Sequence, residues 1–214
     1  EMFPGPLNFS LSGKALSKNL WDLRTINIRD FGAGKHQSVD DTPAGGGAGM
    51  ILKPNIVDRA LRAATQDLEH SKEAWPLIFL TPHGKKFTQD MAFRLSKAKG
   101  IVLVCGRYEG IDTRVINKWN LEEVSLGDFI LSGGELVSYT IIEAVVRLLP
   151  GVLGNQESIL EESFSNGLLE YPQYTRPSSW DGQKIPEVLM SGNHQEIQQW
   201  RKKQSEKITK EKRP

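Results

Sequence analysis

The sequence predicts an α/β protein in which helices cover both faces of a parallel sheet. Short apolar runs typical of buried strands, at 77–81 and 101–104, alternate with helical patterns starting at 54 and over 88–99. The chain has 214 residues, 38% of them apolar and 25% charged. This is enough for one sizeable core, or for a core and a small additional domain.

The first fifty residues contain weaker signals. A helical spacing of leucines over 11–21 predicts a helix, and the alternation of Ile26 and Ile28 with polar neighbours predicts a strand over 25–31. The glycine-rich residues 32–49 have no apolar periodicity, so they predict a loop of a length that is usually functional or mobile.

The next elements follow the strand and helix rhythm. The helix starting at Pro54 has Asn55 and Asp58 at the positions of an N-cap and its partner three residues later. A glycine at position 100 is expected to close the second helix. The remaining elements expected in this domain are a helix at 112–119, a strand at 123–126 and a helix at 135–149.

The composition changes after Gly151. Residues 152–185, rich in polar residues, aromatics and prolines, are expected to link residues 1–151 to a small helical domain at 186–214. Asn193 and Glu196 are expected to cap its helix, which has apolar residues on one side and basic residues on the other. Residues 200–214 hold seven Lys or Arg against two Glu.

We call Arg201, Lys202, Lys203 and Lys207 the basic stripe. A basic helix face is by default simply solvated, but with Trp200 beside it the stripe also suits an RNA backbone and a stacked base. One cysteine, no signal peptide and no long apolar run predict a cytoplasmic protein without a membrane partner.

Two glycine loops are expected at the carboxyl ends of strands, where α/β sheets bind ligands. They read CGRYEGID at 105–112 and LGDFILSGGEL at 126–136. Ordinary turns are the alternative interpretation. The chain has no G-x-G-x-x-G, no P-loop and no Cys/His cluster with metal-ligand spacing, which disfavours dinucleotide, P-loop and structural zinc sites.

These two loops closely resemble the signature loops of the bacterial tRNA (guanine-N1)-methyltransferases. Those enzymes are S-adenosylmethionine-dependent members of the knotted SPOUT class, and they modify guanosine 37, just 3′ of the anticodon. The resemblance extends to further blocks along the chain: VDDTPAGGGAGM at 39–50, PGVLG at 150–154, YPQYTRP at 171–177 and LMSGNH at 189–194.

The resemblance implies a SPOUT domain with a trefoil knot formed by 106–110 and 126–134, against the general rule that chains are unknotted. It also implies that a short apolar strand before Glu1 and helices after Pro214 are missing from this sequence. The implied S-adenosylmethionine site comprises Leu80, Thr81, Pro82, Gly106, Tyr108, Gly110, Leu126, Gly127, Asp128, Phe129, Ile130, Leu131, Gly133 and Gly134. Phe129 stands where the family usually has tyrosine.

Catalytic roles follow from the resemblance as well. N1 of guanine carries a proton, so methylation needs a base for that proton and a donor near O6. The resemblance assigns these roles to Glu162, where many relatives have aspartate, and to Arg147. It places Asp40, Arg107, Arg201 and Lys202 in substrate binding, and it implies Glu109 as a ligand of Mg²⁺, on which family members depend.

A homodimer is also expected, with each active site built from two subunits as in relatives. The helix at 135–149 is apolar nearly all round, through Ile141, Ile142, Val145 and Val146, which suggests burial on more than one side.

Other functions remain open from the sequence. The chain could be a non-catalytic RNA-binding module, which would need no glycine-lined cofactor pocket, or a SPOUT enzyme with another RNA target. A third hypothesis makes Cys105 a nucleophile with His83 as its base, although a lone cysteine ending an apolar strand is more often a small buried hydrophobe.

Overall fold

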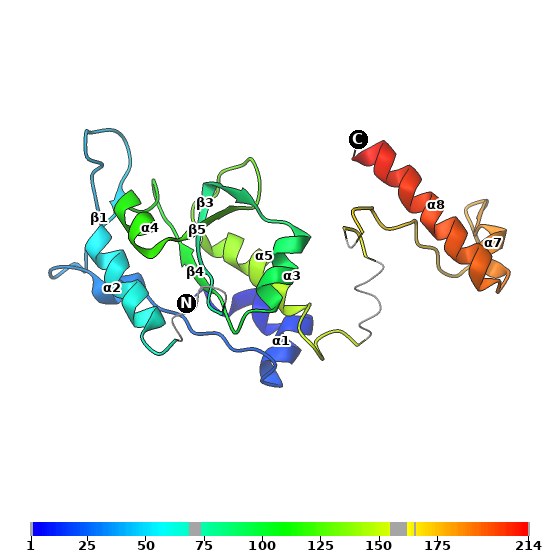
Figure 1. The fold of residues 1–214 in the computed structure, drawn as a ribbon, viewed down its shortest axis with the longest axis horizontal. Helices are drawn as coiled ribbons and strands as arrows, with labels where there is room; N and C mark the ends of the chain where they lie inside the picture. The colour runs from blue at the N-terminus through cyan, green and yellow to red at the C-terminus, as the bar shows by residue number, and fades with distance from the viewer. Residues whose placement is uncertain (1, 69–73, 155–161, 165, 214) are drawn as a thin grey trace. The chain divides into compact units, whose positions relative to one another are not determined.

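A three-stranded parallel sheet lies at the centre of residues 1–154 (Figure 1). Its strands are β3 (Leu77–Lys86), β4 (Val102–Cys105) and β5 (Glu122–Ser125), in the order β4-β3-β5. The computed structural model describes residues 2–68, 74–154, 162–164 and 166–213. The chain divides into two units, unit 1 (1–154) and unit 2 (155–214).

Helices cover both faces of this sheet, as the sequence predicts (Figure 1). Phe79 of β3 packs into a cluster with α2 (Pro54–Thr65) and α4 (Thr113–Trp119). Ile78 and Leu80 point to the other face and pack with α3 (Gln89–Ser96) and α5 (Glu135–Val146). Because alternate residues of a strand face opposite sides, one apolar run supplies both cores.

Helix α5 lies between two layers of the same unit. Ile141 and Val145 pack toward the sheet, whereas Ile142 and Val146 pack on η1 (Gly5–Asn8) and α1 (Ser10–Ser17). All four side chains are 8% exposed or less within the single chain. The predicted burial on more than one side of α5 is thus confirmed, but contacts within one subunit account for it, so these four residues give no support to a subunit interface.

The amino-terminal elements differ from expectation. Helix α1 ends at Ser17, earlier than predicted, and buries the small residues Ser12, Gly13 and Ala15. The predicted strand at 25–31 is wrong, because residues 28–31 form the 3₁₀ helix η2 (Ile28–Phe31). The side chain of Asn27 accepts a hydrogen bond from the Arg29 N–H at 3.1 Å and so caps η2.

The glycine-rich residues 32–49 form a loop, as predicted, apart from two short pairings, one of them a bridge between Ala33 and Ser38. Strand β1 (Asp40–Asp41) pairs antiparallel with β2 (Ile51–Leu52), so that Asp40 lies opposite Leu52. This pairing holds the middle of the glycine-rich segment against the strand that directly precedes α2.

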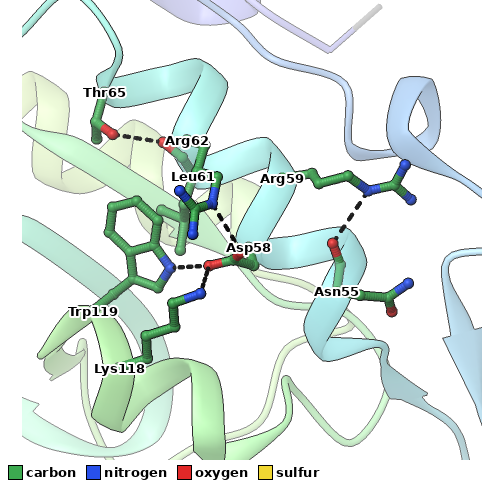
Figure 2. A network of polar contacts seen from close by, with 8 residues as sticks. All are labelled: Asn55, Asp58, Arg59, Leu61, Arg62, Thr65, Lys118 and Trp119. Carbon is green, nitrogen blue, oxygen red and sulfur yellow. Dashed lines mark hydrogen bonds and ion pairs between the residues drawn. The ribbon is translucent and has the colours of Figure 1, made fainter.

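Asp58 links two helices instead of capping one. The predicted Asn55–Asp58 cap is wrong: Lys53 is the N-cap of α2, Pro54 occupies the first turn, and no side chain caps the helix. Asp58 accepts hydrogen bonds from Arg62 of its own helix at 3.0 Å and from Trp119 of α4 at 2.8 Å (Figure 2). The Lys118 ammonium lies 2.7 Å from the same carboxylate.

The charge of Asp58 is stabilised by these contacts. Burial would raise the pKa of Asp58, but the hydrogen bonds from Lys118, Arg62 and Trp119 outweigh burial and lower the pKa to about 2. The carboxylate thus stays ionised while it joins α2 to α4.

Several element boundaries also shift. Strand β3 continues past Thr81 to Lys86, with a change in its register against β5 between Leu80 and Lys85. Helix α3 ends at Ser96, four residues before Gly100. Gly100 instead lies against the Trp75 ring, where an added Cβ would come within 2.2 Å of a ring carbon.

The described part of unit 2 contains a hairpin and two helices. Strands β6 (Ser179–Trp180) and β7 (Gln183–Lys184) pair antiparallel within the segment predicted as a linker. They precede α7 (Glu187–Met190) and the 19-residue helix α8 (His194–Lys212). The side chain of Asn193 accepts a hydrogen bond from the Glu196 N–H at 3.3 Å, which confirms the predicted cap.

Candidate functional site

The two glycine loops meet in unit 1. They follow β4 and β5, and the Gly134 N–H donates to the Gly106 carbonyl at 3.0 Å. Arg107 and Gly133 form an antiparallel bridge beside this bond. A Cβ added to Gly134 would lie 2.8 Å from the Cα of Cys105, so only glycine allows the two backbones to come this close.

An ion pair also joins the two loops. The Nε of Arg107 donates to Glu135, the first residue of α5, at 2.9 Å. A terminal nitrogen of Arg107 lies 3.8 Å from the sulfur of Met2. Arg107, which the resemblance placed in substrate binding, is therefore a bridge between the loops in this structure.

The residues implied in cofactor binding divide into a floor and a rim. Leu80, Thr81, Gly106 and Gly134 are buried and form the floor, in the middle of β3, directly after β4 and directly before α5. Leu126, Gly127, Gly110 and Gly133 are half-buried. The exposed members, which form the rim, are Pro82, Tyr108, Asp128, Phe129, Ile130 and Leu131.

Two members of the rim carry further signals. Tyr108 has φ +57°, a left-handed conformation that is uncommon for a residue with a side chain and that concentrates at ligand sites. Its side chain is 55% exposed. Asp128 accepts a hydrogen bond from Lys86 at 2.8 Å, which ties the second glycine loop to the end of β3.

A third loop borders the first glycine loop. The Glu109 N–H donates to the Met50 carbonyl, and the Leu52 N–H donates to the Gly110 carbonyl, each at 3.0 Å. Because Leu52 is also the partner of Asp40, the predicted substrate residue Asp40 lies on the strand pair next to this loop.

Glu109 is exposed and lies beside Gly49, where an added Cβ would come within 2.5 Å of the carboxylate. Within the described part of the chain, no three His, Cys, Asp or Glu side chains gather closely enough to hold a metal ion. The donor set around Glu109 therefore does not amount to a Mg²⁺ site by itself.

The two predicted catalytic residues belong to different units. Arg147 is the C-cap of α5 in unit 1, and its N–H donates to the Glu143 carbonyl at 3.2 Å. Glu162 lies in unit 2 and, like Arg147, is half-buried.

The residues of the basic stripe also differ in their exposure to solvent. The Arg201 guanidinium lies 4.7 Å from the centre of the Tyr171 ring and is half-buried, whereas Lys202, Lys203 and Lys207 are exposed. Arg201 thus packs within unit 2, and the lysines form the solvent-facing part of the stripe.

Cys105 is unsuited to act as a nucleophile. Burial raises the pKa of its thiol to about 11, an effect that a hydrogen bond with Ser138 only partly offsets. A thiol with this pKa is protonated near neutral pH and therefore poorly nucleophilic.

Sequence reasoning missed two residues at this site, Glu135 and Lys86, which pair with Arg107 and Asp128. Glu135 was detectable in principle, because an acidic residue directly after Gly133-Gly134 is favoured in the first turn of a helix. Lys86 has no comparable local signal.

No helix in the described residues is both long and apolar enough to cross a membrane. The fold and the site together define an α/β protein with two glycine loops joined at the carboxyl edge of a parallel sheet, the location where this class binds cofactors.

Comparison with known proteins assigns the family. Residues 1–214 match the profile of tRNA (Guanine-1)-methyltransferase TrmD. A tRNA (guanine-N(1)-)-methyltransferase of Jannaschia sp. (strain CCS1) is 54% identical over the whole chain, which covers 87% of that relative. Proteins of the same name are 55% identical in Cereibacter sphaeroides (strain KD131) and 53% in Roseobacter denitrificans, 86% and 88% of which are covered, again over the whole chain. The chain belongs to the tRNA (guanine-1)-methyltransferase TrmD family and is a methyltransferase.

Proposed function

We propose that this protein transfers a methyl group from S-adenosylmethionine to N1 of guanosine 37, the nucleotide 3′ of the anticodon in tRNA. Family membership supports the reaction class. The observation that carries the proposal is the junction of Gly106 and Gly134, which brings together the two loops that resemble the family's signature loops.

The joined loops suit a cofactor that is bound mainly through backbone. At Gly134 no Cβ fits, and the buried floor of small and apolar residues lies beside an exposed rim that is mostly apolar. Tyr108, Phe129 and Ile130 of this rim can cover an adenine ring or a methionine chain. We further propose that 106–110 and 126–134 form a trefoil knot.

The chemistry needs a proton acceptor and a cation. Bound S-adenosylmethionine supplies an electrophilic methyl group. In our proposal Glu162 removes the N1 proton of guanine, and Arg147 stabilises the negative charge that builds on O6. Glu162 is one methylene longer than the aspartate of many relatives, about 1.5 Å of additional reach. The segment that carries Glu162 must therefore be placed differently if the carboxylate is to reach N1.

Substrate binding is proposed to use both units. In unit 1, Asp40 contacts guanine, whereas the exposed lysines of the basic stripe bind the tRNA backbone. We keep the division into a SPOUT domain (1–151), a linker (152–185) and a tRNA-binding helical domain (186–214). A cytoplasmic location follows from the substrate. Glu109 would contribute one ligand to Mg²⁺, and no step of the proposed reaction depends on it.

A homodimer remains part of the proposal, on a surface other than the buried faces of α5. Leu136 on α5 is 53% exposed, and Phe129 and Ile130 in the preceding loop are 54% and 78% exposed. Large apolar side chains that are exposed together are typical of a protein interface. Such an interface would place a second subunit beside the cofactor loops.

The test is a methylation assay with labelled S-adenosylmethionine and two tRNA transcripts, one with G and one with A 3′ of the anticodon. We expect label only in the G transcript, with the methyl group on N1 by mass spectrometry. Methylation of another nucleotide would indicate a different RNA target. Absence of heat on calorimetric titration with S-adenosylmethionine would favour an RNA-binding module.

A further inference from the structure

The chain that follows Glu162 is fastened along α8. We call residues 166–174 the α8 strap. The Leu169 N–H of the strap donates to the Thr209 hydroxyl at 2.8 Å. Further along, Tyr171 stacks under Arg201, and the rings of Tyr174 and Trp200 lie 6.2 Å apart. Residue numbers rise along the strap as they fall along α8, so the strap runs antiparallel to the helix.

Thr209 makes the polar contact that sets the register of the strap. Its hydroxyl accepts from the Leu169 N–H and donates to the Ser205 carbonyl one turn back, at 2.7 Å. One accepted and one donated hydrogen bond fix the orientation of the hydroxyl. The ring contacts of Tyr171 and Tyr174, in contrast, would still form if the strap shifted along α8. Ser205, at 8% exposure, is the most deeply buried of the unit 2 side chains that the structure describes.

A second pair of hydrogen bonds connects the strap to the predicted base. The Glu170 N–H donates to the Ser163 hydroxyl at 2.9 Å, and the Phe164 N–H donates to the Leu168 carbonyl at 2.7 Å. Ser163 is the neighbour of Glu162 in the chain. Ser163 and Phe164, which follow Glu162 in the chain, are thus bonded to residues 168–170, and Leu169 is bonded to α8 at Thr209.

We infer that Thr209 is a positioning residue for methyl transfer: it sets the place of the Glu162 carboxylate relative to α8. This inference rests on the proposed role of Glu162 as base. The opposite side of α8 presents Lys203, Lys207 and Lys210 to solvent, where they can bind RNA phosphates. One helix would then fix both the register of the tRNA and the position of the base that acts on it.

The test is Thr209→Val, which keeps the shape of the side chain and removes the hydroxyl, in the intact enzyme. We expect faster hydrogen exchange of the Leu169 amide and a single-turnover methyl-transfer rate lower by about 10- to 100-fold, because small misplacements of catalytic groups have effects of this order. The KM for tRNA should not change. Thr209→Ser keeps the hydroxyl and should restore the rate.

The matched control is Thr65→Val. Thr65 is a half-buried threonine of α2 whose hydroxyl donates to the Leu61 carbonyl at 2.9 Å, the same local bond without a strap (Figure 2). This variant should methylate at the normal rate. Equal losses in Thr65→Val and Thr209→Val would show a general effect on helix stability and would overturn the inference.

The double variant Glu162→Gln/Thr209→Val separates this inference from the proposed function. If Thr209 acts through Glu162, the double variant should be no slower than Glu162→Gln alone. Losses that multiply would contradict the inference. If Glu162→Gln is slow and Thr209→Val is normal, only the inference is wrong. If Glu162→Gln is itself normal, the proposed base is wrong, and the inference is rejected with it.

Discussion

Different interactions stabilise the interior of each of the two units. Every apolar side chain that is buried in the described structure lies in unit 1, in three clusters around the sheet and α5. In the described part of unit 2, Ser205 alone is buried, and the visible contacts are ring contacts, cation–π contacts and hydrogen bonds. Hydrophobic burial is the dominant favourable term in folding, so unit 1 has the better-defined core.

This difference matches the division of the proposed site. The glycine loops, the proposed cofactor site, are fixed by the core of unit 1, where the meeting of Gly106 and Gly134 needs an accurate backbone position. The proposed base lies in unit 2, which has few buried contacts among its described residues, and regions of this kind open more readily. Changes at the proposed base and at the exposed lysines of unit 2 should therefore affect chemistry and RNA binding, and changes in the glycine loops of unit 1 should affect cofactor binding.

The largest effect is expected from Glu162→Gln in unit 2. Loss of the base should lower the single-turnover methyl-transfer rate by about 10² to 10⁴, or roughly 3–5 kcal/mol of barrier, with little change in cofactor affinity. Arg147→Ala should cause a similar loss. Glu206→Gln, on an exposed position of α8, is the control. A normal rate in Glu162→Gln together with a lowered rate in Glu161→Gln would identify Glu161 as the base instead. Glu161 lies outside the described residues.

Gly134→Ala in unit 1 should lower cofactor affinity, which Glu162→Gln should leave little changed. The added Cβ meets backbone atoms at 2.8 and 3.2 Å, so the two loops must separate. We expect cofactor affinity to fall by about 10²-fold, or about 2.7 kcal/mol, on calorimetric titration. Gly154→Ala is the matched control because no atom lies within 4 Å of its added Cβ. Unchanged affinity in Gly134→Ala would show that the cofactor does not bind at these loops.

Neutralising Lys202, Lys203, Lys207 and Lys210 should have a smaller effect, limited to RNA. All four lysines are exposed on α8. Each lost phosphate contact should reduce the slope of log K against log salt by about 0.9, equally for every tRNA. Filter-binding titrations at several salt concentrations measure this slope. A loss confined to one tRNA would indicate base recognition instead.

The smallest effect is expected from Asp58→Asn, between α2 and α4. The pKa of Asp58 is lowered from 3.8 to about 2, so its contacts stabilise the fold above about pH 4 and lose this effect as the pH falls toward 2. Urea unfolding at pH 7 should show a loss of about 1 kcal/mol, less than the full shift implies because water screens charges near the surface. The loss should shrink at pH 3. Asp67→Asn, an exposed partner of Arg24, should change stability little.

The sequence predicted the elements that depend on local information. The apolar runs of β3 and β4 and the cap at Asn193 were all found from residues within a few positions of one another. The prediction of a strand at 25–31 was wrong. The alternation of Ile26 and Ile28 with polar residues is a local pattern, whereas a strand also needs a partner strand, which depends on distant residues.

The same limit applies to the site. The rule for the carboxyl ends of parallel strands predicted that the two glycine loops would lie side by side, and their hydrogen bond confirms it. The pairing of Arg107 with Glu135 spans 28 positions, and that of Trp119 with Asp58 spans 61. No periodicity relates such residues, so the bridges could not be predicted from sequence patterns alone.

The half-buried Cys105 has a practical consequence for spectroscopy. It is the only cysteine, and with a pKa of about 11 its reactive thiolate amounts to about one molecule in 10⁴ at pH 7. A cysteine introduced at an exposed position such as Lys210 has an ordinary pKa near 8.5 and should react with a maleimide about 10²-fold faster. Fluorophores or spin labels can therefore be attached to chosen positions in either unit without removing the native thiol.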